Sequence, residues 1–162
     1  MFYKEEILNM LDEKGIAYEK MEHPAVFTME EMDALGITEK GFVCKNLFLR
    51  DAKGKTHFLL SMPEEKKVSL KEMAAPLETD KLSFASAQRL EKYLGLKTGA
   101  ISPFGVWNDT ENKVIVILDE ELMAQEKIGV HPNDNTATVW IAPKTLCDLI
   151  KEKGNECRVV KL

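Results

Sequence analysis

The sequence predicts an α+β fold, with one domain over residues 1–162 and a mixed, mainly antiparallel sheet flanked by helices. Two observations favour this class. Strand-like runs alternate with amphipathic segments that carry helix caps, and the clearest strand pair forms a hairpin. The length of 162 residues is close to that of one ordinary domain, and no repeat or Pro/Gly/Ser-rich linker divides it.

The N-terminal third contains two helix signals. Apolar residues at helical spacing predict a helix over 3–14, which Gly15 ends. Residues 16–18 then indicate a short strand. A capping box that begins at Thr28 opens a second helix, and Gly36 ends it.

The middle of the chain contains the predicted hairpin. Two strands, 42–50 and 56–62, flank a polar turn. Another capping box begins at Ser69, with Pro76 near the end of its helix. The segment 86–95 then reads as a helix that starts at a serine and closes at a glycine.

The C-terminal third alternates between strands and helices. Strands are predicted over 113–118, 136–141 and 157–161. An acidic start predicts a short helix within 119–129, closed by its final glycine. The segment 143–153 is predicted as a helix because proline stands at its first position and glycine follows its end.

Composition limits the partners. The net charge of −5 argues against a general nucleic-acid coat, so we expect no DNA binding. No apolar run reaches the ~18 residues that span a bilayer, and the N-terminus lacks a signal-peptide pattern, so we expect a cytoplasmic protein without a membrane partner. The three cysteines form no CxxC pair, which fits reduced thiols better than a zinc site.

Lys45 is the first residue that points to chemistry. Side chains alternate along the predicted strand, so Lys45 shares a face with Val43, Leu47 and Leu49. A lysine among aliphatic side chains is costly to bury without a purpose. It is either a functional cation or a strand-end lysine whose amine reaches water. Asn46 faces the other way and, if buried, needs hydrogen-bond partners.

The segment Gly99–Gly105 has loop chemistry. Its backbone N–H groups can form a cradle for a carbonyl or an anion, or it is an ordinary turn. No Gly-Lys-Ser/Thr follows, so it is not a P-loop. Ser102 lacks the GxSxG context of a nucleophile elbow, and we do not expect it to be a nucleophile.

The histidines and Cys44 are further candidates for a chemical role. His131 precedes a proline and can donate a hydrogen bond or relay a proton, or it belongs to a polar loop. His57 is expected to face solvent, and the three scattered histidines indicate no metal site. Cys44 is expected to pack in the core rather than act as a thiolate, because strand alternation turns it away from Lys45.

Together these motifs resemble one family, the aminoacyl-tRNA deacylases of the YbaK and prolyl-tRNA synthetase-associated type. The fold of this family also occurs as the editing domain of bacterial prolyl-tRNA synthetases. The motif Lys-Asn-Leu-Phe-Leu-Arg-Asp looks most like the ProX-type branch, which removes alanine from the tRNA for proline. The resemblance covers nearly the whole chain and rests on residues 23–28, 45–51, 82–86, 99–105 and 131–138.

The resemblance implies a freestanding trans-editing hydrolase that cleaves mischarged tRNA, most closely alanyl-tRNA(Pro), to alanine and tRNA. It implies catalytic roles for Lys45, Asn46 and His131. It also implies a substrate-binding loop made of Gly99, Ala100, Ile101, Ser102 and Pro103. Phe27, Met29 and Met32 are hypothesised as walls of the amino-acid pocket. The implied partners are the acceptor end of aminoacylated tRNA and prolyl-tRNA synthetase, with no cofactor and no metal.

Two alternatives stay open. A cysteinyl-tRNA(Pro) deacylase would differ only in its pocket. A catalytically inactive regulatory or RNA-binding module of the same fold would bind tRNA without hydrolysing its ester.

Overall fold

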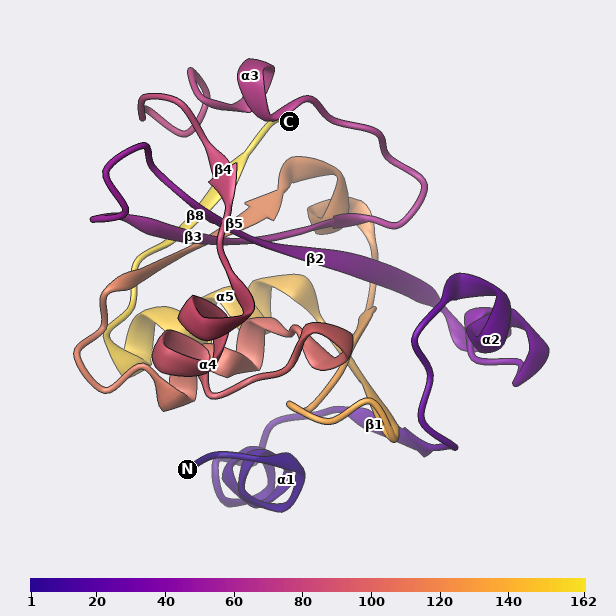
Figure 1. Ribbon diagram of the computed structural model, residues 1–162. Helices are drawn as coiled ribbons and strands as arrows, with labels where there is room; N and C mark the ends of the chain where they lie inside the picture. Colours follow the sequence, from indigo (N-terminus) through magenta and orange to yellow (C-terminus); the bar gives the residue numbers. More distant parts are fainter.

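The structure, a computed structural model, describes residues 1–162 and has the predicted α+β architecture (Figure 1). The strands are β1 (Glu19–Glu22), β2 (Phe42–Arg50), β3 (His57–Pro63), β4 (Ser83–Phe84), β5 (Val114–Asp119), β6 (Ile128–Val130), β7 (Ala137–Ile141) and β8 (Cys157–Val160). The α-helices are α1 (Lys4–Glu13), α2 (Met29–Ala34), α3 (Leu70–Met73), α4 (Ala87–Leu94) and α5 (Pro143–Lys153). Short 3₁₀ segments are η1 (Thr38–Lys40), η2 (Thr98–Ala100), η3 (Pro103–Asn108) and η4 (Glu120–Ala124).

The sheet is mixed, in the order β1-β7-β6-β2-β3-β5-β8, with β4 as an additional partner of β2. One edge of β2 pairs antiparallel with β3 along residues 44–50. The other edge pairs in parallel with β6 at residues 42–43 and antiparallel with β4 at residues 49–50. The middle of that second edge therefore has no strand partner, and a gap opens in the sheet beside residues 44–48.

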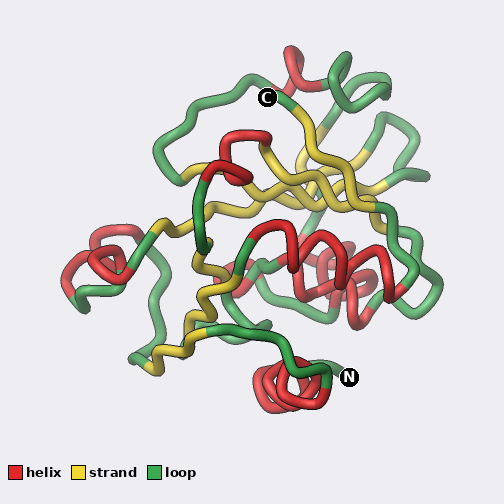
Figure 2. Tube along the Cα trace, turned by 180° about the vertical axis from the view of Figure 1, so that it is seen from behind, coloured by secondary structure: helices red, strands yellow, loops and turns green.

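Helices cover the sheet unequally. Figure 2 shows α4 and α5 below the strands β2, β3, β5 and β8, α3 above these strands, and α1 at the bottom of the molecule. The larger core of 26 buried residues includes side chains of α1, α4 and α5 together with Phe104 and Val116. A smaller cluster on the other face joins α3 to Leu49 and Phe58. Both faces of β2 are therefore packed near its C-terminal end, whereas α2 lies beyond its N-terminal end (Figure 1).

Most predicted elements agree with the structure because their end signals are local. Helix α5 begins at Pro143 and ends before Gly154, as predicted. Thr28 caps α2, and its hydroxyl oxygen accepts a hydrogen bond from the Glu31 N–H. The predicted capping box at Ser69 is not formed, since its side chain makes no cap hydrogen bond with α3.

Two predictions near the sheet edge were wrong. The strand expected at 16–18 starts later, at Glu19, where the chain reaches β7 and pairs Glu19 with Trp140. Gly129 lies inside β6 rather than at a helix end. Trp140 pairs with Gly129 across the strands, and a Cβ at Gly129 would lie 2.4 Å from the Trp140 ring. The glycine is needed for this close approach and not as a helix stop.

The expectation that His57 faces solvent was also wrong, because its side chain is buried. Its ring stacks on Phe48 at a centroid distance of 5.4 Å and contacts Tyr93 at 4.1 Å. The Arg89 guanidinium donates to Nε2 of His57, at 3.1 Å, which requires a neutral ring. Burial, followed by the Arg89 charge, lowers the pKa of His57 to about 4.

This burial predicts a loss of stability in acid. Unfolded His57 takes up a proton near its ordinary pKa of 6.5, whereas the folded ring does so only near 4. Its contribution to the free energy of unfolding is thus complete above pH 6.5 and falls by roughly 2–3 kcal/mol as the pH drops through 4. Urea unfolding between pH 7 and 4 should show a steeper decline for the wild type than for His57→Phe. Equal slopes would contradict this role.

Candidate functional site

A cleft of about 160 Å³ opens at the gap in the sheet beside β2. We call it the central cleft. It brings together segments that are far apart in the sequence, from the start of α2, β2, the turn after β3, the 98–101 loop and the end of β6. Its lining residues are Val26, Phe27, Thr28, Met29, Met32, Cys44, Asn46, Glu64, Thr98, Gly99, Ile101 and His131.

Asn46 is held in the cleft by its neighbour across the strands. The Ser61 hydroxyl donates to Oδ1 of Asn46 at 2.5 Å, and these two residues are paired between β2 and β3. This bond fixes the orientation of the amide. The Nδ2 group of Asn46 is then left to donate a hydrogen bond into the cleft.

His131 lies opposite, at the end of β6. Its Nδ1 is 2.9 Å from the Ala137 carbonyl oxygen, so Nδ1 carries the proton and Nε2 is an acceptor. Burial lowers the pKa of His131, and the nearby His23 ring, 6.4 Å away between centroids, adds to this effect. The ring is therefore a neutral base or acceptor at pH 7 rather than a cation.

The 98–101 loop forms the third side of the cleft. Gly99 approaches Phe27 so closely that a Cβ would lie 2.7 Å from its ring, so a side chain there would displace Phe27. Ser102 is fully buried, and its hydroxyl donates to the main-chain oxygen of His131. Ser102 therefore ties the loop to His131 and is not available as a nucleophile. Pro103 is buried behind it.

Lys45 does not line the cleft. It lies on the opposite face of β2 from Asn46, as strand alternation predicts, and its amine donates to the main-chain oxygen of Lys66. The amine nevertheless lies close enough to Glu64, a cleft residue, to oppose protonation of that carboxyl electrostatically. Of the three predicted catalytic side chains, the structure brings Asn46 and His131 together and places Lys45 behind the rim.

A buried ion pair supports the turn that Lys45 contacts. The Lys66 amine is 2.8 Å from Oδ2 of Asp119, whose side chain is fully buried, and 3.3 Å from Glu121. These carboxylates raise the pKa of Lys66 against the opposing effect of burial. The turn at residues 64–67 is therefore anchored to the end of β5.

Burial raises the pKa of two titratable residues that line the cleft, Cys44 and Glu64. Burial raises the pKa of the Cys44 thiol to about 12, so Cys44 packs as an apolar side chain, as expected. Glu64 is half-buried, and burial raises its pKa as well. Sequence reasoning missed Glu64 as a site residue. The available signal was its place directly after β3, the strand that pairs with the Lys45 strand.

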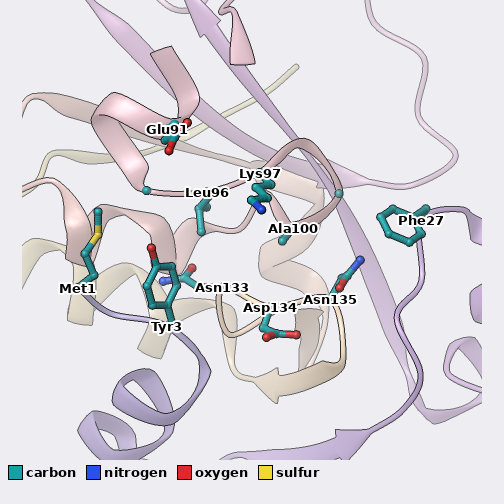
Figure 3. Close-up of a pocket in the computed structure, with 12 residues that line it drawn as sticks. Met1, Tyr3, Phe27, Glu91, Leu96, Lys97, Ala100, Asn133, Asp134 and Asn135 are labelled. Atoms are coloured by element: carbon teal, nitrogen blue, oxygen red, sulfur yellow. The ribbon is translucent and has the colours of Figure 1, made fainter. Parts of the chain in front are cut away.

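A second, larger cavity of about 490 Å³ adjoins the central cleft, and we call it the outer cavity (Figure 3). Phe27 and Gly99 line both spaces. Ala100, predicted to bind substrate, lines the outer cavity instead of the central cleft. The N-terminal residues Met1 and Tyr3 also line it, and sequence reasoning gave them no role.

Two further observations concern metal ions and membranes. The structure contains no group of three or more His, Cys, Asp or Glu side chains that could bind a metal ion. None of its helices has the length and apolar character needed to cross a bilayer. The polar groups of the cleft can donate to a carbonyl oxygen, accept from a water molecule and pair with a cation.

Comparisons with known proteins identify the family of the chain. Residues 23–149 match the family described as the aminoacyl-tRNA editing domain, so the chain belongs to that family. It is an aminoacyl-tRNA deacylase, an enzyme that hydrolyses the ester between an amino acid and tRNA.

Relatives of similar length are known. The chain is 43% identical to the prolyl-tRNA editing protein ProX of Acetoanaerobium sticklandii, over 98% of this chain and 97% of that protein. It is 33% identical to the prolyl-tRNA synthetase associated domain-containing protein 1 of Danio rerio, over 92% and 82% of the two chains. A crystal structure described as a candidate trans-editing enzyme for prolyl tRNA synthetase shares the fold, with a TM-score of 0.71, 20% identity, and coverage of 96% and 94%.

Proposed function

We propose that this chain is a trans-editing enzyme that hydrolyses alanyl-tRNA(Pro) to free alanine and tRNA. The observation that carries the proposal is the central cleft, which joins Asn46, Gly99 and His131 in a space of only about 160 Å³. The name of the ProX relative supports the tRNA for proline as substrate. We further propose that the mischarged tRNA comes from prolyl-tRNA synthetase.

The proposed reaction is attack of water on the ester carbon. The carbonyl oxygen gains negative charge in the transition state, and N–H groups of the Gly99 loop donate to it. One such donor can be worth about 3–4 kcal/mol. Nε2 of His131 accepts a hydrogen bond from the attacking water, and Nδ2 of Asn46 orients the ester. The ribose hydroxyl leaves with a proton, so the products are alanine and intact tRNA.

Lys45 would supply positive charge to the cleft from its place behind the rim. Its amine exchanges the Lys66 main-chain oxygen for the ester or the developing oxyanion, and no covalent intermediate is required. A lysine stem is flexible and its ammonium is a compact charge, so this exchange replaces one hydrogen bond by another. Lys45 acts in this proposal as an electrostatic catalyst.

Selectivity would come from the size of the cleft. Each methylene that a substrate lacks costs only about 1–3 kcal/mol of binding, so a synthetase pocket shaped for proline does not fully reject alanine, which lacks two of the ring carbons. A second pocket that admits alanine and excludes the larger proline ring corrects this error. We propose Phe27, Met29 and Met32 as the walls that exclude proline, because all three line the central cleft.

We propose that Glu64 binds the α-ammonium group of the amino acid. It is the one carboxylate among the residues that line the central cleft. Burial disfavours its charged form, and an ammonium group seated beside it would restore that form. An ester with a free amine would thus be bound by a charge pair that an N-blocked ester cannot make.

This role predicts a substrate-dependent effect of Glu64→Gln. A hydrogen bond between charged groups is worth about 1.5–3 kcal/mol, so kcat/KM for alanyl-tRNA(Pro) should fall about 10–100-fold. Hydrolysis of N-acetylalanyl-tRNA(Pro), compared in the same assay, should hardly change. The matched control is Glu65→Gln, which alters an exposed neighbour. Equal losses on both substrates would show that Glu64 does not contact the amine.

The proposed function is tested by supplying alanyl-, cysteinyl- and prolyl-tRNA(Pro) to the purified protein and following loss of the amino acid. We expect rapid loss of alanine while proline is retained. Preferential loss of cysteine would assign the cysteinyl-tRNA(Pro) deacylase activity instead. No hydrolysis above the buffer control, with tight and salt-sensitive tRNA binding, would favour a regulatory or RNA-binding module.

A further inference from the structure

We infer that the outer cavity binds the base of the 3′-terminal adenosine, the nucleoside that carries the ester. This inference rests on the proposed function, because it places the nucleoside relative to an ester in the central cleft. An ester and its ribose are covalently joined, so the base must lie in a space continuous with the cleft. Phe27 and Gly99 line both spaces and mark the junction.

The size and shape of the outer cavity suit a nucleoside. Its volume of about 490 Å³ falls within the range of about 300–1,000 Å³ typical of small-molecule sites. In Figure 3, Phe27 and Tyr3 stand at opposite ends, with Lys97 and Ala100 on one side and residues 133–135 on the other. The ribose then lies near Phe27 and the base near Tyr3.

Tyr3 provides a stacking surface at the far end. Its side chain is 46% exposed although it lines a cavity. The N-terminal segment that carries it is fastened at Phe2, whose main-chain oxygen accepts hydrogen bonds from Asn108 (3.1 Å) and Asn133 (2.9 Å). Unpaired bases are commonly bound by stacking on such aromatic rings. The fastened segment keeps the ring in place before the base arrives.

Asn133 provides an acceptor at the floor of the cavity. It is only 5% exposed, and its Oδ1 is a buried side-chain oxygen without a hydrogen-bond partner. Its Nδ2 is already used, on Phe2 and Phe104. A buried acceptor without a partner is unfavourable, and the exocyclic amine of adenine is a donor that asparagine commonly accepts. A small movement of Asn133 would bring its Oδ1 within hydrogen-bond distance of the adenine amine.

The cavity also has carboxylates that can bind the amino group of a base. Glu91 and Asp134 line it together with Lys97 and the N-terminal residue Met1. Hydrogen bonds from Thr136 lower the pKa of Asp134 against the effect of burial, so this carboxylate stays charged at neutral pH. Both carboxylates can accept hydrogen bonds from the exocyclic amino group of a base.

A competing location lies on the other flank of the central cleft. Another cavity, of about 390 Å³, shares Asn46, Thr98 and Ile101 with the cleft and carries the exposed Phe84 at its edge. Its other lining residues are apolar, so it offers few groups that could read a base edge. Phe84 is therefore the matched control for Tyr3.

The test compares three variants on alanyl-tRNA(Pro). If the base stacks on Tyr3, Tyr3→Ala should raise KM at least fivefold, which is the smallest effect expected when one stacked base is lost. The change should hardly alter kcat. Tyr3→Phe should keep the wild-type KM, and Phe84→Ala should leave both constants unchanged. Equal KM values for Tyr3→Ala and Tyr3→Phe, or a raised KM for Phe84→Ala alone, would overturn the inference.

A binding measurement separates this inference from the proposed function. Adenosine 5′-monophosphate is titrated into the isotopically labelled wild-type protein, and amide NMR shifts are mapped, with cytidine 5′-monophosphate as the control. We expect saturable shifts around Tyr3, Lys97 and Asn133 with the adenine nucleotide and weaker ones with the cytosine nucleotide. This result would stand even if no tested tRNA were deacylated. Shifts confined to the Phe84 cavity, or none at all, would overturn the inference while leaving the deacylase activity untouched.

Discussion

Replacing Lys45 by alanine is expected to lower kcat for hydrolysis of alanyl-tRNA(Pro) by about 100–1,000-fold, the usual effect of removing one oxyanion-stabilising group. The neutral His131 cannot supply positive charge, and Asn46 offers only an amide. Lys45 is the cation whose charge reaches the cleft carboxylate Glu64. Single-turnover deacylation with enzyme in excess measures the chemical step directly.

Lys67→Ala is the control for this prediction. Lys67 is exposed in the turn that Lys45 contacts, and its removal changes the net charge equally. It should leave the single-turnover rate within about twofold, since isolated surface charges have small effects. A Lys45→Ala enzyme that keeps its rate within the same margin would remove Lys45 from the mechanism. Thermal unfolding of both variants would show whether either change disturbs the fold.

Lys66→Met should have the second large effect, on stability and on activity together. The change leaves the Asp119 carboxylate buried without its cation, at 0% side-chain exposure. Removing one partner of a buried pair costs about 3–5 kcal/mol; Lys66 itself remains partly exposed, so we expect about 3 kcal/mol. For a domain of this size the melting temperature should then fall by roughly 6–12 °C.

The activity should fall as well, because Lys66 anchors the turn that positions Lys45 and Glu64. Lys66 is thus a positioning residue, and its loss should raise KM for alanyl-tRNA(Pro) more than for the N-acetylated ester, on which Glu64 does not act. A double variant with Asp119→Asn removes the stranded charge and should recover part of the lost stability. A double variant as unstable as the sum of the single changes would argue against a coupled pair.

Elements with strong local end signals could be predicted from the sequence. Helix α5 is defined by Pro143 and Gly154, and α4 by Ser86 and Gly95, because caps act through hydrogen bonds within a few residues. Strand β6 could not be predicted in the same way. Its three residues become a strand only because β2 and Trp140 of β7 lie beside them.

The candidate site, too, could be predicted only in part from the sequence. The alternation of a strand was enough to place Lys45 and Asn46 on opposite faces of β2. Their partners could not be read from the sequence, since Ser61 reaches Asn46 from a paired strand and Lys66 reaches Lys45 from a distant turn. Glu64 could be recognised as a cleft residue only from the structure, because it reaches the cleft from the turn after β3.

The sequence by itself determined the class of fold, the ends of the capped helices, the hairpin and the family motifs, because these depend on residues close together in the chain. Only the tertiary structure decided that His57 is buried, that Gly129 lies against Trp140, and that Tyr3 lines a cavity with Asn133. Burial, close approach and a shared cavity depend on which distant segments meet. Neither the spacing nor the chemistry of neighbouring residues contains that information.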